Sequence, residues 1–290
     1  MNTALKATAF AAGLAATFTA AYGVGHAVGP AQAHPAAHPG AHADHQAGGL
    51  QTAERGYTLS LDRPVVPAGG PTELSFRVLA PDGHPLTAYR PAHEKELHLI
   101  VANRDLTDFQ HLHPVRAADG TWTAPANIAA AGDYRVFADF TPAAETAPLT
   151  LGADLHAAGD HRPAALPQTG RTVTVDGYTL TLTGDLTPGR PGRLAFTVTE
   201  DGRPVTDLDP YLAAYGHLVA LRAGDLGYLH VHPDGEPGDG TTAPGPEIDF
   251  TATAPSPGDY RLFLDFQHQG TVHTAAFTLT AETTPEPHQH

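Results

Sequence analysis

The segment GDYRVFADF, residues 132–140, returns as GDYRLFLDF, residues 258–266. Apolar and polar side chains alternate along both copies, which is typical of a β-strand with one face in a core. Three further pairs keep an offset near 120 residues: GYTLSL (56–61) with GYTLTL (177–182), ELSFRV (73–78) with RLAFTV (193–198), and PDGHPLT (81–87) with EDGRPVT (200–206). The chain is therefore a tandem duplication of a domain of about 110 residues.

Within each copy, short alternating segments rich in Val, Leu, Thr, Tyr and Phe are separated by turn signals, and no long helical pattern intervenes. The turn signals are Asp82-Gly83, Asp119-Gly120, Asp201-Gly202 and Pro257-Gly258. The sequence predicts an all-β chain of two tandem antiparallel β-sandwich domains, immunoglobulin-like or cupredoxin-like, with about seven strands each.

The predicted organisation follows from composition. The segments are a signal peptide or uncleaved anchor at 1–33, a disordered His-rich segment at 34–54, a β-sandwich repeat at 55–158, a linker at 159–171, a second repeat at 172–282 and a disordered tail at 283–290. Residues 34–49 contain almost no large apolar side chain, so they cannot bury a core.

The N-terminal segment indicates export. Lys6 precedes an apolar, Ala-rich run, and Ala31-Gln32-Ala33 is a small-x-small cleavage pattern, so the mature chain would begin at His34. The run is also long enough for an uncleaved membrane anchor, since about 20 apolar residues span a bilayer. In either case the repeats are expected outside the cytoplasm, secreted or anchored.

Charge and missing residue types narrow the functions. Lys and Arg total 16 against 31 Asp and Glu, a net charge of -15, which excludes nucleic acid and an anionic membrane surface as partners. The chain has no Cys and one Met, the initiator, so imidazole, with carboxylate support, is the transition-metal ligand that remains among 19 histidines.

One histidine triplet occurs twice with the same spacing. Thirteen positions separate the first histidine from the second, and two more lead to the third. The triplets are His98, His111 and His113 in the first copy and His217, His230 and His232 in the second.

Strand geometry makes the spacing a prediction of proximity. If residues 103 and 108 are opposed in a hairpin, His98 lies across from His113 and diagonal to His111, with Cβ atoms about 4.5–8 Å apart. The same register places His217 across from His232. The alternative is that each H-x-H pair is a solvated strand end beside Pro114 or Pro233.

Three neutral imidazoles suit Cu(II) or Zn(II), and the Irving–Williams order favours copper over zinc. Without Cys or Met, neither a blue-copper centre nor a dedicated Cu(I) site is expected.

Other polar residues have alternative roles. Asp139 and Asp265 could orient an imidazole, although turn hydrogen bonds are commoner for an aspartate at a strand end. His268 and His273 are expected as exposed loop residues. Tyr134 and Tyr260 are expected to pack in the core, with a corner-type hydrogen bond as a further option.

The chain ends are also rich in histidine. If cleavage follows Ala33, His34 would present an α-amine beside its imidazole, as in histidine-brace copper proteins. Disordered metal-scavenging tails are the simpler interpretation. No catalytic motif such as G-x-S-x-G or H-E-x-x-H is present, so a non-enzymatic protein is expected.

The string HLIV…DFQHLHP…GDYRVFADF, followed by YLAAYGHLVAL…YLHVHP…YRLFLDF, resembles a family of secreted or membrane-anchored bacterial β-sandwich proteins, common in high-GC genomes and often encoded beside heavy-metal transport systems. The resemblance implies extracytoplasmic copper or heavy-metal handling, and a membrane metal transporter as a possible partner.

Two principal hypotheses follow. In the first, the protein buffers or delivers Cu(II), or Zn(II), through one three-histidine site per repeat. In the second, it is a non-enzymatic interaction or adhesion module whose histidines are surface residues. A copper oxidase with a brace at His34 is a third.

Overall fold

The computed structural model describes residues 47–229 and 231–282, and for His232 it describes the backbone alone. These residues lie within one compact unit, 45–290. The described residues form strands, turns and bends and no helix. No helix that could cross a membrane is therefore found among them. The predicted signal or anchor at 1–33 and the tail at 283–290 lie outside the described residues.

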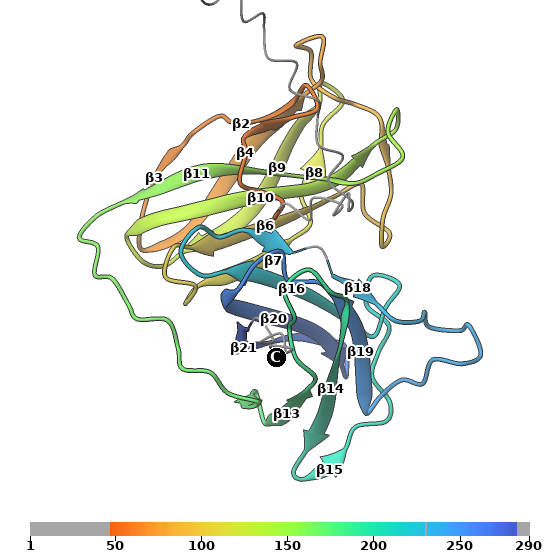
Figure 1. Ribbon diagram of the computed structural model, residues 1–290. Helices are drawn as coiled ribbons and strands as arrows, with labels where there is room; N and C mark the ends of the chain where they lie inside the picture. The colour runs from red at the N-terminus through yellow and green to blue at the C-terminus, as the bar shows by residue number, and fades with distance from the viewer. Residues whose placement is uncertain (1–46, 230, 283–290) are drawn as a thin grey trace, which may run out of the picture. The chain divides into compact units, whose positions relative to one another are not determined.

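The first repeat is a sandwich of two sheets (Figure 1). One sheet has the order β1-β2-β4-β9-β8, and the other has the order β3-β11-β10-β6-β7 with β5 added to β10. All pairs are antiparallel except β3 with β11. The strands are β1 (Ala53–Glu54), β2 (Tyr57–Leu61), β3 (Val65–Pro67), β4 (Gly70–Leu79), β5 (Tyr89–Arg90), β6 (Leu97–Asn103), β7 (Phe109–Leu112), β8 (Val115–Arg116), β9 (Thr121–Ile128), β10 (Gly132–Pro142) and β11 (Leu149–Ala158).

The second repeat builds a corresponding pair of sheets around the same central strands. Their orders are β12-β13-β14-β19-β18, with β15 added to β14, and β17-β16-β20-β21. The strands are β12 (Thr172–Val175), β13 (Tyr178–Thr183), β14 (Gly192–Glu200), β15 (Arg203–Pro204), β16 (Gly216–Arg222), β17 (Tyr228–Leu229), β18 (His232–Pro233), β19 (Glu247–Ala252), β20 (Gly258–His268) and β21 (Thr271–Ala281).

The strand order is that of an immunoglobulin sandwich, so the predicted all-β tandem fold is confirmed. In that fold, strands A, B, E and D form one sheet and C, F and G the other. Here β2-β4-β9-β8 faces β6-β10-β11, and β13-β14-β19-β18 faces β16-β20-β21.

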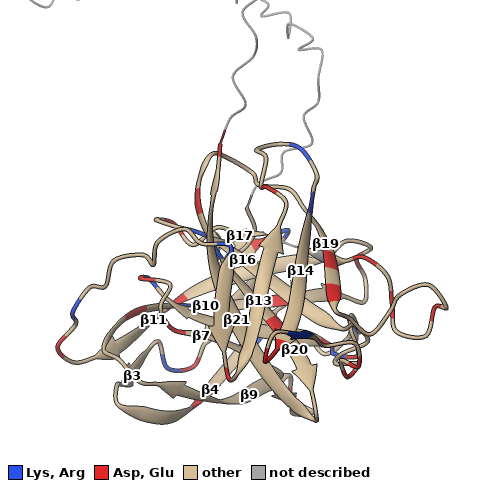
Figure 2. Cartoon of the chain, turned by 90° about the horizontal axis from the view of Figure 1, so that it is seen from below, with Lys and Arg blue, Asp and Glu red and all other residues tan. Residues whose placement is uncertain are grey.

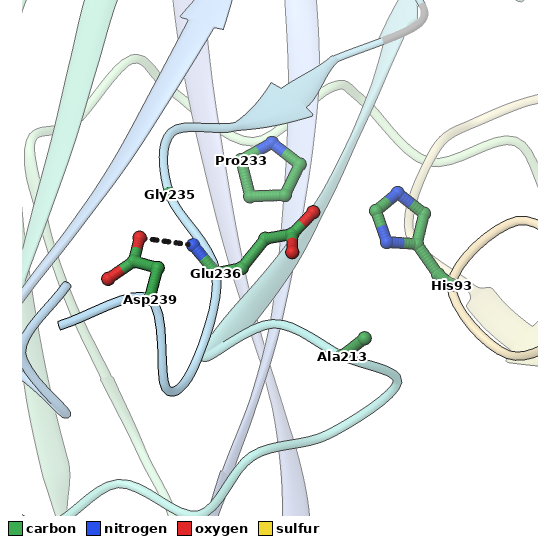
Figure 3. Close-up of a pocket in the computed structure, with 6 residues that line it drawn as sticks. All are labelled: His93, Ala213, Pro233, Gly235, Glu236 and Asp239. Carbon is green, nitrogen blue, oxygen red and sulfur yellow. Dashed lines mark hydrogen bonds between the residues drawn. The ribbon is translucent and has the colours of Figure 1, made fainter. Parts of the chain in front are cut away.

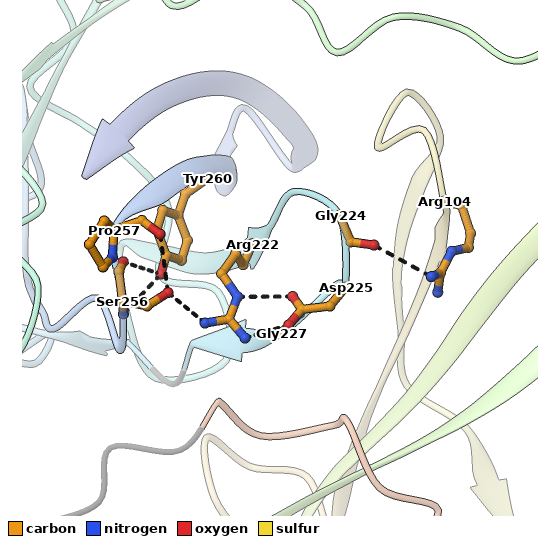
Figure 4. A network of polar contacts seen from close by, with 8 residues as sticks. All are labelled: Arg104, Arg222, Gly224, Asp225, Gly227, Ser256, Pro257 and Tyr260. Atoms are coloured by element: carbon orange, nitrogen blue, oxygen red, sulfur yellow. Dashed lines mark hydrogen bonds and ion pairs between the residues drawn. The ribbon is translucent and has the colours of Figure 1, made fainter. Parts of the chain in front are cut away.

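Each repeat also has a tyrosine corner, in which a tyrosine at the start of strand F bonds the backbone a few residues upstream. The Tyr134 hydroxyl donates to the Ala130 carbonyl at 3.0 Å, and the Tyr260 hydroxyl donates to the Ser256 carbonyl at 2.8 Å. Figure 4 shows the second corner, where Arg222 joins Ser256 to Asp225.

Each sandwich has its own apolar core. The first contains Phe76, Trp122 and Tyr134 among other buried side chains. The second contains Phe196 and Phe250. These cores lie between the two sheets of each repeat, so they hold each sandwich together by itself.

A third apolar cluster joins the outer faces of the two sheets that carry strands C and F. The first repeat contributes Ile100, Ala102, Leu106 and Phe137, and the second contributes Val219, Leu221, Leu226, Tyr228 and Phe263. Because β6 and β16 bury residues on both faces, the triplet histidines sit beside an interface between repeats.

A glycine-containing segment, residues 47–51, lines this interface. Gly48 exchanges two backbone hydrogen bonds of 2.9 Å with Tyr228 of the second repeat, while Gly49 donates to the Thr150 carbonyl of the first at 2.8 Å. The expected disorder over 34–54 therefore does not extend to 47–54, which also include β1. The reason is that glycine lets backbone approach the interface without needing large side chains.

The acidic side chains do not form a single patch. Figure 2 shows Asp and Glu spread over many loops and strand ends rather than gathered at one place.

Candidate metal centre

His98 lies on β6, and its ring is fixed by a backbone group. Its Nε2 is 3.0 Å from the Ala92 carbonyl oxygen, which only accepts, so in the neutral ring Nε2 carries the proton. Nδ1 then presents its lone pair. Burial, with the charge that a protonated His111 would carry, lowers the pKa of His98 to about 4. His98 is therefore neutral at pH 7.

His111 lies on β7, and its ring is fixed by a carboxylate of the other repeat. Its Nδ1 is 2.8 Å from Oδ2 of Asp265 on β20. Because the carboxylate accepts, the neutral ring carries its proton on Nδ1 and presents the lone pair of Nε2. That Nε2 lies 3.1 Å from Nδ1 of His98.

His113 completes the group. Its ring centroid is 5.3 Å from that of His98 and 4.8 Å from that of His111. Its Nε2 is buried and has no hydrogen-bond partner. Burial lowers its pKa to about 3, so this ring is neutral as well. One ligand atom from each of the three histidines lies within 4.8 Å of the others.

The predicted hairpin register is confirmed. Leu99 pairs with Leu112, Ala102 pairs with Phe109, and the Asn103 amide donates to the Asp108 carbonyl. Continuing this register places His98 across from His113. In the second repeat, Ala220 pairs with Leu229 and Leu221 with Tyr228, the register that was expected there.

The second triplet is described in part. His217 on β16 repeats the environment of His98: its Nε2 is 2.8 Å from the Tyr211 carbonyl, and burial lowers its pKa to about 4. Its ring centroid lies 6.1 Å from that of His111 and 6.4 Å from that of His98. His230 and the side chain of His232 lie outside the described part, so their role as ligands stays a prediction.

Equivalent turns supply both carbonyl groups. Ala92 and Lys95 exchange two backbone hydrogen bonds, as do Tyr211 and Ala214. The central residues of each turn have positive φ, at 49° for His93 and 64° for Glu94 in the first. Strained turns of this kind persist where surrounding structure fixes them, often at functional sites. No spacing in the sequence indicated these carbonyls.

His93 was also missed by the sequence analysis. Its ring centroid lies 5.2 Å from that of His217 and 6.3 Å from that of His98. It also lines a pocket of about 350 Å³ with Ala213, Pro233, Gly235, Glu236 and Asp239 (Figure 3). In Figure 3 the Glu236 carboxylate extends toward the His93 side of this pocket. His93 thus lies between the pocket and the buried histidines.

Turn hydrogen bonds were the commoner role expected for Asp139 and Asp265, and this expectation is wrong for Asp265. It bonds His111 across the repeats, and its Oδ1 accepts from the Thr274 hydroxyl at 2.6 Å. Asp139 has the equivalent threonine, Thr150, whose hydroxyl donates at 3.2 Å. Asp139 also forms a side-chain hydrogen bond with Tyr228 of the second repeat. Sequence alone does not indicate such contacts between repeats.

The expected exposure of His268 and His273 is also wrong. Both are buried at the end of the β20–β21 hairpin. His268 Nδ1 lies 2.8 Å from the Tyr178 hydroxyl, and His273 Nδ1 lies 2.9 Å from Asp176. Tyr178 of β13 and Asp176 of the turn before it pack against this hairpin from the other sheet, which buries both rings. The other histidines considered above, His34 and those of the chain ends, lie outside the described residues.

A family model for a domain of unknown function, DUF8832, matches residues 51–154 and again 173–283. The chain belongs to the DUF8832 family. The two matched segments coincide with the two sandwiches, so each DUF8832 domain is one immunoglobulin-like unit. No curated protein matches the chain.

Similar solved structures include FdeC, an adhesin of Escherichia coli (18% identity over 80% of this DUF8832 chain and 65% of that chain, TM-score 0.25). InvD of Yersinia pseudotuberculosis gives 12% identity over 80% of this chain and 59% of that chain, with a TM-score of 0.26. The fibronectin(III)-like modules of Clostridium thermocellum CbhA give 11% identity over 80% of this chain and 100% of that chain, with a TM-score of 0.20. The chain spans less than two thirds of the length of the FdeC and InvD chains. TM-scores this low carry no inference about activity or partners.

Proposed function

We propose that the protein is a non-catalytic metal-binding protein that holds Cu(II), with Zn(II) as the second choice, through His98, His111 and His113. The observation that carries the proposal is the 3.1 Å contact between His98 Nδ1 and His111 Nε2. When both rings are neutral, hydrogen bonds on their far sides leave a lone pair on each facing nitrogen. Two facing lone pairs repel unless a proton or a metal cation lies between them.

His113 adds a third donor close to the first two. Its buried Nε2 has no partner within the protein, and a buried polar atom without a partner costs about 1–3 kcal/mol. The three donor atoms lie within 4.8 Å of one another, and a metal ion about 2.0–2.1 Å from each would draw them to within about 4.2 Å and satisfy all three. A carbonyl or carboxylate on the other ring nitrogen is the usual companion of a metal-bound histidine.

The donor set decides the metal. Three neutral imidazoles without thiolate suit divalent copper and zinc, and copper binds such sites more tightly. The second triplet, His217, His230 and His232, is proposed to bind a second ion in the same way. The proposed setting is outside the cytoplasm, where the protein buffers copper or passes it to a membrane metal transporter.

The test is metal content after competition with a weak chelator. The full chain is loaded with Cu(II), passed over a desalting column containing excess glycine, and analysed for copper. We expect about two ions per wild-type chain and one fewer in H111A/H113A. Glycine removes loosely held copper from the His-rich ends.

The matched control is H156A/H161A, which removes two exposed histidines, one from the first repeat and one from the linker that follows it. This variant should keep the wild-type copper content. Equal copper in H111A/H113A and wild type would refute the site. Absence of retained copper from wild type would favour the alternative function, an interaction or adhesion module with structural histidines.

A further inference from the structure

The first repeat's site includes a residue of the second repeat. His111 Nδ1 contacts Asp265 Oδ2 at 2.8 Å, and the two side chains are 7% and 4% exposed. We propose that metal occupancy of the three-histidine site and docking of the two sandwiches are coupled, so that each stabilises the other. This inference rests on the proposed metal function and adds its regulation.

Asp265 is a positioning residue for His111. Its Oδ1 accepts from Thr274 on the neighbouring strand, which fixes the carboxylate, and its Oδ2 fixes the ring and the tautomer of His111. Outer contacts of this kind change metal affinity by about 10–100-fold when they are removed. Separation of the sandwiches removes this contact without altering any ligand.

Charge provides a second link. Imidazole binds a metal as a neutral ligand, so a bound divalent cation brings uncompensated positive charge into a buried site. Asp265 of the second repeat supplies negative charge on one side. Asp139 of the first repeat, which pairs with His98 in the β10–β6 register, is a second carboxylate near the site. The cation therefore attracts carboxylates of both sandwiches.

Aromatic contacts belong to the apolar part of the interface between the repeats. The Phe109 and Phe263 rings stack with centroids 4.0 Å apart and planes at 6°. A second aromatic contact relates the repeats in the opposite sense. Phe137 of the first repeat, at the position equivalent to Phe263, has its ring centroid 5.6 Å from that of Tyr228 of the second repeat. Weakening this docking surface must weaken metal binding if the two are coupled, because linkage is reciprocal.

The experiment measures the Cu(II) Kd of the full chain against a chromogenic chelator. The background is H230A/H232A, so that one predicted site is titrated. We expect the Kd to rise about 10–100-fold in D265N, which keeps the size of the side chain and loses its charge. It should rise at least five-fold in F263A, which removes the ring that stacks on Phe109 across the interface and leaves Asp265 in place.

The control is D259N. Asp259 lies on the same strand, is exposed and accepts from Thr280 at 2.6 Å, as Asp265 does from Thr274. Its Kd should stay within two-fold of the background. In parallel, hydrogen exchange of the 47–51 segment, which bonds both repeats, should slow on adding Cu(II) in the background and not in D265N.

The outcomes separate the two proposals. Failure of the background protein to bind Cu(II) overturns the metal site itself. Binding with unchanged Kd in D265N and F263A overturns the coupling and leaves the metal site standing. A raised Kd in D265N with unchanged Kd in F263A reduces Asp265 to a local role and likewise overturns the coupling.

Discussion

His98 Nδ1 and His111 Nε2 lie 3.1 Å apart, and the opposite nitrogen of each ring faces an acceptor. One acceptor is a backbone carbonyl of the same repeat, and the other is a carboxylate of the second repeat. The facing atoms are therefore prepared for a cation by groups far apart in sequence. The consequences can be measured without a structure of the loaded protein.

Metal binding should stabilise the fold. An ion that binds only the native state at 100 times its Kd adds about 2.7 kcal/mol to the free energy of unfolding. We expect Cu(II) to give an increase of this order at each occupied site in denaturant titrations. H98A should lose the increment of the first site, whereas H156A, which removes an exposed histidine, should keep it.

His93 should affect the rate of metal uptake more than the affinity. Its ring lies between the pocket and the rings of His98 and His217, but it is not one of the three close donors. H93N removes the imidazole and keeps a residue that tolerates positive φ. Stopped-flow mixing with Cu(II) should show uptake slowed at least five-fold, with the equilibrium Kd within two-fold of wild type. A large change in Kd with unchanged uptake would instead make His93 a ligand.

The sequence predicts the fold and the local site geometry because both depend on short-range patterns. The strand period of two, the repeated turns and the hairpin length suffice to place His98 opposite His113. Orientation of an imidazole was one of two roles open to Asp265, but its partner could not be predicted, because His111 is 154 residues away and on another sandwich. One signal was available: Ile100 and Ala102 are apolar on the histidine side of β6, which indicates a strand buried on both faces.

Gly49 should be more sensitive to substitution than an ordinary turn glycine. A Cβ at this position would lie 2.3 Å from Cδ1 of Phe137, and φ is +70°. G49A is expected to lower the free energy of unfolding by about 1–3 kcal/mol through overpacking, in addition to backbone strain. Urea titration measures the loss.

The matched control is G69A. Gly69 also has positive φ, at +102°, but a Cβ there meets nothing within 4 Å. It therefore reports backbone strain alone, and its loss should be smaller than that of G49A. Equal losses would show that segment 47–51 tolerates a side chain against Phe137.

Asp108 should make stability depend on pH in the opposite sense to a salt-bridged carboxylate. Burial raises its pKa, and the hydrogen bond from the Tyr134 hydroxyl, at 3.2 Å, acts in the other direction. Because the folded pKa lies above the unfolded value of about 3.9, the unfolded state loses this proton first as pH rises. The contribution of Asp108 is thus most favourable below the unfolded pKa and is lost as pH rises through the folded pKa.

D108N removes this titration and keeps an oxygen that can accept from Tyr134. We expect D108N to be more stable than wild type at pH 7 and equal to it near pH 3, in denaturant titrations at both values. D82N removes one negative charge from an exposed turn and controls for the acidic net charge. A gain of equal size in D82N, or a D108N gain that persists unchanged to pH 3, would assign the effect to general charge repulsion rather than to burial of Asp108.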